Sequence, residues 1–157
     1  MFAPRTLILG LTTATLLLTT SAQASGPCAK AVEETADPPP MPGRFVPQCT
    51  DKGYYKLVQF HGSTGYSWCV NPSTGAKVEG TDVAPGKGTP TCPVCVEQLA
   101  SSLEKTLVGA YSPQCSADGT FQKVQHNAST RMAWCADTKT GKKLTKPVRN
   151  DGKLTCR

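Results

Sequence analysis

Eight cysteines and two histidines are the residues of this 157-residue chain whose types could support metal binding or thiol chemistry. Cys92 and Cys95 stand in a C-x-x-C run, a spacing found in zinc ribbons and in thiol–disulfide catalysts. A zinc site needs further ligands, but no second C-x-x-C exists, and only His61 and His126 could supply nitrogen. We therefore expect neither a metal site nor a redox-active pair at this position.

The other reactive side chains form no catalytic arrangement. The two histidines fall at non-equivalent positions, and no Ser-His-Asp set or repeated pair of carboxylates accompanies them. We predict that the protein is not an enzyme and that it requires no cofactor.

The cysteines instead follow an internal repeat. The run from Phe45 to Cys49 recurs 66 positions later as Tyr111 to Cys115, and Trp68-Cys69 recurs at the same offset as Trp134-Cys135. An unchanged register between these two runs indicates one supersecondary unit used twice. We predict two modules, residues 25–92 and 93–157, so that Cys92 ends the first and Cys95 begins the second.

A targeting segment is expected before the repeats. Arg5 precedes an apolar run over residues 7–18, which is shorter than the roughly 20 residues that a membrane-spanning helix needs. Ala22-Gln-Ala24 follows as a typical cleavage site, so we interpret residues 1–24 as a secretory signal peptide rather than a membrane anchor. A mature secreted, extracellular chain without membrane attachment is the expectation.

Secretion favours disulfide bonds for the cysteines, because an even number in short extracellular modules is typical of a disulfide framework. Each repeat holds four, and counting alone leaves three pairings open in each. The cysteines of the first repeat are Cys28, Cys49, Cys69 and Cys92, and those of the second are Cys95, Cys115, Cys135 and Cys156.

A helix is expected at the start of each repeat and a pair of strands after it. In the second repeat Pro93 suits the first helical position, apolar residues recur at helical spacing up to Leu107, and Gly109 suits a C-terminal cap. The helix of the first repeat is expected over residues 28–36. The strands are expected over residues 54–59 and 66–70, and over residues 120–125 and 132–136.

The motifs of each repeat resemble the thyroglobulin type-1 domain over nearly the whole mature chain. In the first repeat they are Pro42 to Cys49, Gly53-Tyr-Tyr55, Gln59, Gly62 to Val70, and Gly75 before Cys92. The resemblance implies a small disulfide-rich α+β fold of two tandem modules, each a short helix followed by a small antiparallel sheet and loops. Trp68 and Trp134 are interpreted as anchors of small cores rather than as platforms for a ligand.

Six cysteines paired in order are usual in that family, and each repeat departs from this pattern. Where the third and fourth cysteines would stand, the first repeat has Phe60 and Ser67, and the second has His126 and Ala133. Since both partners are absent together, the resemblance implies that one bridge is missing from each repeat. It leaves four bridges: Cys28–Cys49, Cys69–Cys92, Cys95–Cys115 and Cys135–Cys156.

Some members of the family, called thyropins, block papain-like cysteine proteases noncovalently by wedging three loops into the active-site cleft. In the first repeat the resemblance places these loops at residues 41–45, 61–65 and 83–88, with Gly43 and Arg44 nearest the catalytic cysteine of the protease. Pro42, Pro47 and the bridge at Cys49 restrict the first loop, which lowers the entropy cost of binding. The candidate protease-binding residues are Met41, Pro42, Gly43, Arg44, Phe45, His61, Gly62, Ser63, Thr64, Gly65, Pro85, Gly86 and Lys87.

The second repeat differs in its loops. It has Val108-Gly-Ala-Tyr111 at the first loop, and Asn127-Ala-Ser129 forms a glycosylation sequon at the second, whereas proline blocks Asn71-Pro-Ser73. We predict that Asn127 is glycosylated. We also expect the first repeat to be the main inhibitor, with the second either silent or directed at another class, such as aspartic proteases.

The net charge of +6 is carried unevenly. Residues 25–92 contain six basic and six acidic side chains, while residues 93–157 contain ten and five. The basic C-terminal part could attract sulfated glycans or could simply be a solvated face. Nucleic acid is not an expected partner, because no stacking aromatics stand among these lysines.

The alternative to inhibition is a non-inhibitory extracellular matrix or binding module that recognises proteins or sulfated glycans. We favour inhibition because no calcium-binding or laminin-like domain accompanies the repeats, which must then carry the function themselves.

Overall fold

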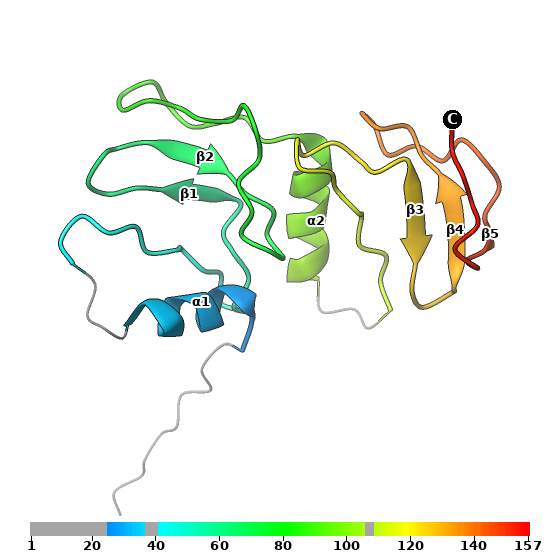
Figure 1. Ribbon diagram of the computed structural model, residues 1–157, viewed down its shortest axis with the longest axis horizontal. Coiled ribbons are helices and arrows are strands. Elements are labelled where there is room, and N and C mark those ends of the chain that lie inside the picture. Colours follow the sequence, from blue (N-terminus) through cyan, green and yellow to red (C-terminus); the bar gives the residue numbers. More distant parts are fainter. Residues whose placement is uncertain (1–24, 37–40, 106–108) are drawn as a thin grey trace, which may run out of the picture.

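The computed structural model describes residues 25–36, 41–105 and 109–157. The predicted signal peptide (residues 1–24), the prolines at 38–40 and Leu107 lie outside these ranges. Each repeat forms a helix and then a small antiparallel sheet, which confirms the expected α+β fold (Figure 1). The elements are α1 (Pro27–Ala36), β1 (Val58–Phe60), β2 (Ser67–Cys69), α2 (Val94–Glu104), β3 (Val124–Asn127), β4 (Met132–Cys135) and β5 (Val148–Arg149).

The strand pairs have equivalent registers in the two repeats. Phe60 on β1 faces Ser67 on β2, and His126 on β3 faces Ala133 on β4. The positions where the family's third and fourth cysteines would stand therefore lie directly opposite each other in both sheets. This geometry agrees with the interpretation that both partners of one bridge are missing.

The strands are shorter than expected. β1 begins at Val58 rather than at residue 54, because the preceding residues make only an isolated bridge between Tyr55 and Cys49. β3 is displaced in the same way and runs on to Asn127, beyond the predicted end at residue 125. β5 was not predicted, since two exposed residues give no pattern that a sequence can show.

Helix α2 also differs at both ends from the expectation. Pro93 is its N-cap residue rather than its first helical residue, and the helix ends at Glu104, with Lys105 in an extended conformation. Gly109 is therefore not its cap. The hydroxyl of Ser102 donates a 2.8 Å hydrogen bond to the Leu99 carbonyl, a local side-chain bond of the kind that weakens helices.

Four disulfides hold the modules together, in the pairing that the family resemblance implies. The bridges join Cys28–Cys49, Cys69–Cys92, Cys95–Cys115 and Cys135–Cys156, with sequence separations of 20 to 23 residues. In the chain-entropy account, a loop of that length stabilises the folded state by about 3 kcal/mol. Small modules bury little apolar surface and depend on such bridges.

The central apolar cluster crosses the boundary between the repeats. Cys69, Val78 and Cys92 of the first repeat pack with Val96 of α2, which belongs to the second. Gly119 of the second repeat lies so close to the first that an added Cβ would stand 2.9 Å from a methyl group of Val78. Helix α2 thus lies between the two sheets and joins the repeats through a shared core (Figure 1).

A buried glutamine fixes the segment before each strand pair. The Gln59 side-chain amide donates to the carbonyls of Gln48 (2.9 Å) and Lys56 (2.7 Å), and its oxygen accepts from the Gln48 amide (2.8 Å). Gln125 makes the same three bonds, to Gln114 and Gln122. The repeated glutamines of the sequence are therefore structural, because each satisfies backbone groups inside its module.

Neither helix in the described part of the chain is long and apolar enough to cross a bilayer.

Candidate functional site

The three predicted loops of the first repeat lie together at one end of that repeat, on the side away from α2 (Figure 1). We call them loop one (residues 41–45), loop two (residues 61–65) and loop three (residues 83–88), and together the three-loop edge. Loop two is the turn between β1 and β2.

Loops one and two are tied by polar and aromatic contacts. The Ser63 hydroxyl donates a 3.1 Å hydrogen bond to the Gly43 carbonyl and lies 3.0 Å from His61 Nδ1. The rings of Phe45 and His61 stack with their centroids 5.8 Å apart and an angle of 17° between planes. Gly43 has a φ of +88°, a conformation that residues with a side chain rarely adopt.

Loop three is held against loop two. Val83 exchanges two backbone hydrogen bonds with Ser67, of 2.8 and 3.1 Å. A Cβ on Gly65 would stand 3.1 Å from the ring of Pro85, so these two loops are in van der Waals contact. The Lys87 amide donates to the Ala84 carbonyl at 3.1 Å and closes a turn at the tip. The three loops are thus connected in series before any partner binds.

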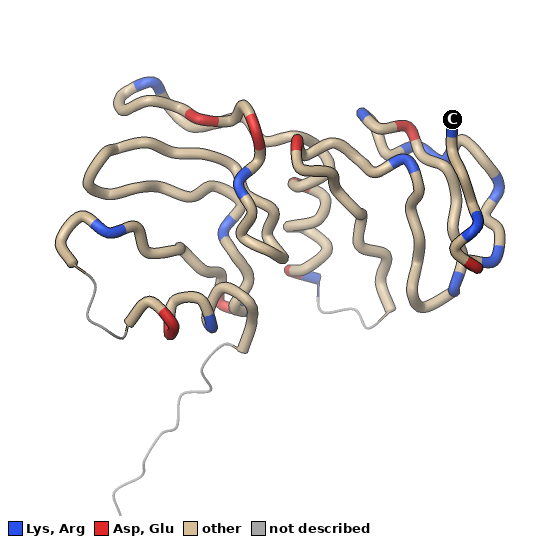
Figure 2. The backbone as a smooth tube through the Cα atoms, in the orientation of Figure 1, with Lys and Arg blue, Asp and Glu red and all other residues tan. Residues whose placement is uncertain are grey.

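The surface of the three-loop edge combines basic and apolar groups. Arg44 and Lys87 stand on loops one and three, and the three loops contain no acidic residue (Figure 2). Met41 is 76% exposed, and Phe60 and Tyr66 are also largely exposed beside loop two. Phe60 and Tyr66 were not among the predicted site residues, although exposed aromatics flanking a candidate loop are a signal that could have included them.

The floor beneath loop one is Trp68. Phe45 packs against it with ring centroids 5.1 Å apart, and the Lys77 ammonium lies 5.3 Å from its ring centre. Lys77 also forms an ion pair with Asp82. Trp68 is half-buried and connects loop one to the sheet.

The second repeat makes contacts equivalent to those of loops one and two, but with different residues at the ends of the loops. Ser129 donates a 2.9 Å hydrogen bond to the Gly109 carbonyl, as Ser63 does to Gly43, and the ring centroids of Tyr111 and Trp134 lie 5.2 Å apart. Trp134 is only 4% exposed.

Two of the differences between the matching loops change the charge or the backbone conformation. Ala110 takes the place of Arg44, and Arg131 takes the place of Gly65 with a φ of +54°, which is unfavourable for a residue with a side chain. The Asn150 amide donates to the Arg131 carbonyl at 2.9 Å, so here too the second and third loops are joined.

Asn127 lies at the end of β3, where the turn to β4 begins. Its side-chain oxygen accepts a hydrogen bond from the Ser129 amide (2.9 Å) and lies 2.7 Å from the Ser129 hydroxyl oxygen, while its amide nitrogen makes no bond in the described structure. Glycosylation of Asn127 stays a prediction.

Shifted pKa values occur in turns rather than in an acid–base site. The pKa of Asp137 is lowered by hydrogen bonds from the amide and hydroxyl of Thr140, and the pKa of Asp118 is lowered in the same way by Thr120. Burial raises the pKa of Tyr111. Within the described ranges, no group of three or more His, Cys, Asp or Glu side chains is placed to hold a metal.

The sequence model of the thyroglobulin type-1 repeat matches residues 28–92 and 95–156. U20-hexatoxin-Hi1a of Hadronyche infensa is 32% identical over 123 residues, which cover 78% of this chain and 80% of the toxin. Equistatin of Actinia equina is 36% identical over 120 residues, and nidogen-2 of Mus musculus is 36% identical over 115. These alignments cover 49% of equistatin and 8% of nidogen-2.

The two matches together span most of the chain, and each covers one of the two modules described above. The chain therefore belongs to the thyroglobulin type-1 family, with two tandem repeats.

Proposed function

We propose that the protein is a secreted, noncovalent inhibitor of papain-like cysteine proteases and that the three-loop edge of the first repeat occupies the active-site cleft. The observation that carries the proposal is the serial connection of the three loops. Ser63 joins loop one to loop two, and the contact of Gly65 with Pro85 joins loop two to loop three. A partner meets an edge that is already ordered, which removes much of the entropy cost that weakens loop-mediated binding.

Loop one would enter the cleft most deeply. Its backbone can approach a protease closely at Gly43, because that residue is exposed and has no side chain. Arg44 and Met41 flank the turn and are exposed, so they would contact the two sides of the cleft. The three loops carry no electrophilic side chain that the thiolate of the protease could attack, so we expect reversible inhibition.

Loops two and three would set selectivity. Loop two presents Thr64 and the neighbouring Tyr66, while loop three presents Pro85 and Lys87. These side chains are exposed, and those of Tyr66, Pro85 and Lys87 differ from the residues at the matching positions of the second repeat, whereas Thr64 is matched by Thr130. We therefore assign the second repeat either no inhibition or a different target class, such as aspartic proteases.

The test measures inhibition by the refolded mature chain, residues 25–157, with all four bridges formed. Papain and cathepsins L, S and B form the panel, with pepsin as an aspartic protease. We expect competitive, reversible inhibition of at least one papain-like enzyme. Gly43→Glu, which adds a bulky charged side chain at the tip, should weaken that inhibition at least 100-fold, or about 3 kcal/mol.

Gly109→Glu is the matched control, since it makes the same change at the equivalent tip of the second repeat. It should leave inhibition of the papain-like enzymes unchanged. Equal losses from both variants would contradict the assignment to the first repeat. Absence of inhibition at micromolar concentration across the whole panel would contradict the proposal itself.

A second candidate is the binding of sulfated glycans by the second repeat. Figure 2 shows basic residues gathered around β5 and the C-terminus, and the exposed ones include Lys142, Lys146, Arg149 and Lys153. Binding to heparin that falls steeply with salt, and that Lys142→Gln with Lys146→Gln reduces, would support this candidate. Binding that survives these changes would contradict it.

A further inference from the structure

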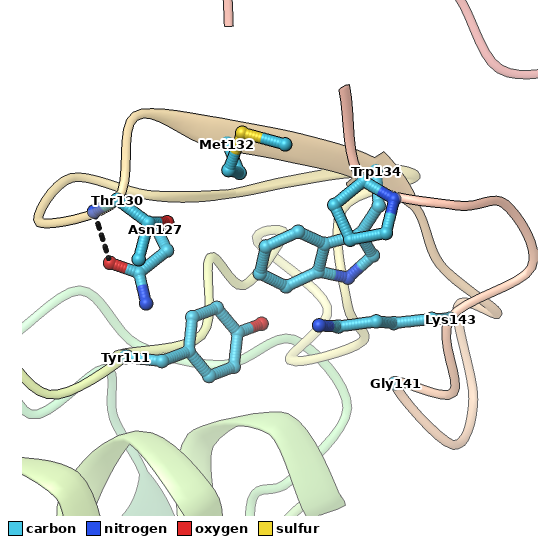
Figure 3. A pocket seen from close by; sticks show the side chains of 8 residues that line it. Tyr111, Asn127, Thr130, Met132, Trp134, Gly141 and Lys143 are labelled. Atoms are coloured by element: carbon cyan, nitrogen blue, oxygen red, sulfur yellow. Dashed lines mark hydrogen bonds between the residues drawn. The ribbon is translucent and has the colours of Figure 1, made fainter. Parts of the chain in front are cut away.

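The second repeat contains a cleft that the proposed inhibition does not use. It has a volume of about 460 Å³ and lies against Trp134 and Met132 of β4, between Tyr111 and the segment that contains Pro147 (Figure 3). This volume is in the range of small-molecule sites. Aromatic and apolar side chains form most of the lining, so the cleft favours a ligand with a flat apolar body.

Two of the polar groups at this cleft are donors that have no acceptor in the described part of the chain. The indole Nε1 of Trp134 is buried and has no hydrogen-bond partner in the described part of the chain, which is unfavourable for a polar group. The Lys143 ammonium lies 4.1 Å from the centre of the same ring and can only donate as well. Figure 3 shows the indole nitrogen directed toward the Lys143 side chain.

The first repeat has an acidic partner at the equivalent lysine, and the second repeat has none. Lys77, which matches Lys143, is paired with Asp82. That is the one ion pair in the described part of the chain, so Lys143 has no carboxylate partner there.

Hydrogen bonds that recur in both repeats show where a residue equivalent to Asp82 would stand in the second repeat. Thr81 accepts from the Cys69 amide and Thr145 accepts from the Cys135 amide, which makes the segments that follow these threonines equivalent. Asp82 follows in the first repeat, whereas Lys146 and Pro147 follow in the second.

The first repeat also has a different arrangement of side chains at the corresponding position. Phe45 stacks on His61 there, whereas the equivalent residues, Tyr111 and Asn127, both line the open cleft. Two differences between the repeats, one steric and one electrostatic, therefore coincide at this position.

We propose that the cleft of the second repeat binds a small organic acid, with its carboxylate between Trp134 Nε1 and Lys143 and its apolar body on the Trp134, Met132 and Pro147 side. The carboxylate supplies the acceptor that the two donors lack and takes the part that Asp82 plays in the first repeat. This site is independent of the three-loop edge.

The test uses nuclear magnetic resonance of the ¹⁵N-labelled, refolded and unglycosylated mature chain. The two tryptophans give two indole N–H signals, and Trp68→Phe assigns the one that belongs to Trp134. We expect 3-phenylpropionate to shift the Trp134 signal in a saturable way, and its neutral amide to bind at least tenfold more weakly, because a hydrogen bond to a charged group is stronger than one to a neutral group.

Lys143→Gln should weaken binding of the acid about tenfold, while Lys77→Gln, the matched change in the first repeat, should leave it unchanged. Pro147→Asp places a carboxylate within the chain and should abolish binding. The proposal is overturned if the amide binds as well as the acid, if Lys77→Gln and Lys143→Gln have equal effects, or if no shift occurs up to 10 mM acid.

Discussion

Replacing Gln59 with leucine tests whether the repeated glutamines hold the modules together. Leucine fills nearly the same volume but removes three hydrogen bonds, of 2.7, 2.8 and 2.9 Å, from a side chain that is 1% exposed. At about 1 kcal/mol for each bond, the loss is about 3 kcal/mol. The extra apolar burial offsets part of this loss, while the Gln48 amide and the Lys56 carbonyl, which would lose their partner, add to it, so we expect a net destabilisation of about 2–4 kcal/mol.

The assay is guanidinium unfolding of the mature chain with its disulfides intact, followed by tryptophan fluorescence. A destabilisation of this size should lower the midpoint by roughly 1 M. Gln125→Leu should have an effect at least as large in the second repeat, since the same three bonds are lost there together with the 2.5 Å bond that Gln125 accepts from the Tyr111 hydroxyl. Gln122→Leu is the control, because that side chain is exposed and makes a single bond to the Cys115 carbonyl.

A midpoint within about 0.2 M of the unmodified chain for Gln59→Leu would refute the reasoning. It would mean that water can hydrogen-bond the backbone groups that Gln59 now satisfies, so that the buried hydrogen bonds of Gln59 contribute little to stability. A large effect from Gln122→Leu would show that the assay reports helix or strand propensity rather than the buried bonds.

Three further predictions follow from single contacts. Ser63→Ala removes the hydrogen bond to the Gly43 carbonyl and should weaken protease inhibition about two- to tenfold without changing the unfolding midpoint. Ser129→Ala, the matching change in the second repeat, should have no effect on inhibition. Gly75→Ala places a Cβ 2.5 Å from the Tyr55 ring at a φ of +73°, so it should destabilise the chain by about 2–4 kcal/mol in the same unfolding assay; a loss below about 1 kcal/mol would contradict the contact. The pKa of Asp137 is lowered in the folded state, so ionised Asp137 stabilises the fold above the ordinary aspartate pKa, and this contribution is lost as the pH falls through the lowered pKa. Asp137→Asn should therefore reduce the loss of stability at acid pH. An unchanged dependence of the unfolding midpoint on pH would contradict this prediction.

Most of the fold was predictable because the residues that determine it recur in both repeats. The Trp-Cys pairs, the paired cysteines and the glycines recur at fixed spacing, and each type has a clear structural role. The strand lengths were not predictable, since residues near Tyr55 and Phe121 form isolated bridges whose neighbours have β-like sequences. β5 was missed because its two residues are exposed and follow a proline.

The loops of the candidate site could be located from sequence, but their mutual contacts could not. Nothing in the spacing shows that Ser63 reaches the carbonyl of Gly43, or that Gly65 approaches Pro85. The cleft of the second repeat was hidden for a related reason. Trp134 does serve as a core anchor, but its unpaired nitrogen becomes visible only when its surroundings are known.

The shared core around α2 has a consequence for the durability of the chain. Proteases cut peptide segments that can extend through the active site, and in tandem proteins such segments are usually the linkers. Here only Pro93 and Val94 separate the bridged Cys92 from the bridged Cys95, and Val94 already belongs to α2. Val94 is exposed, but a protease could extend this junction through its active site only after the start of α2 had unfolded, so the two repeats should remain one covalent piece in the presence of the enzymes that the first repeat is proposed to block.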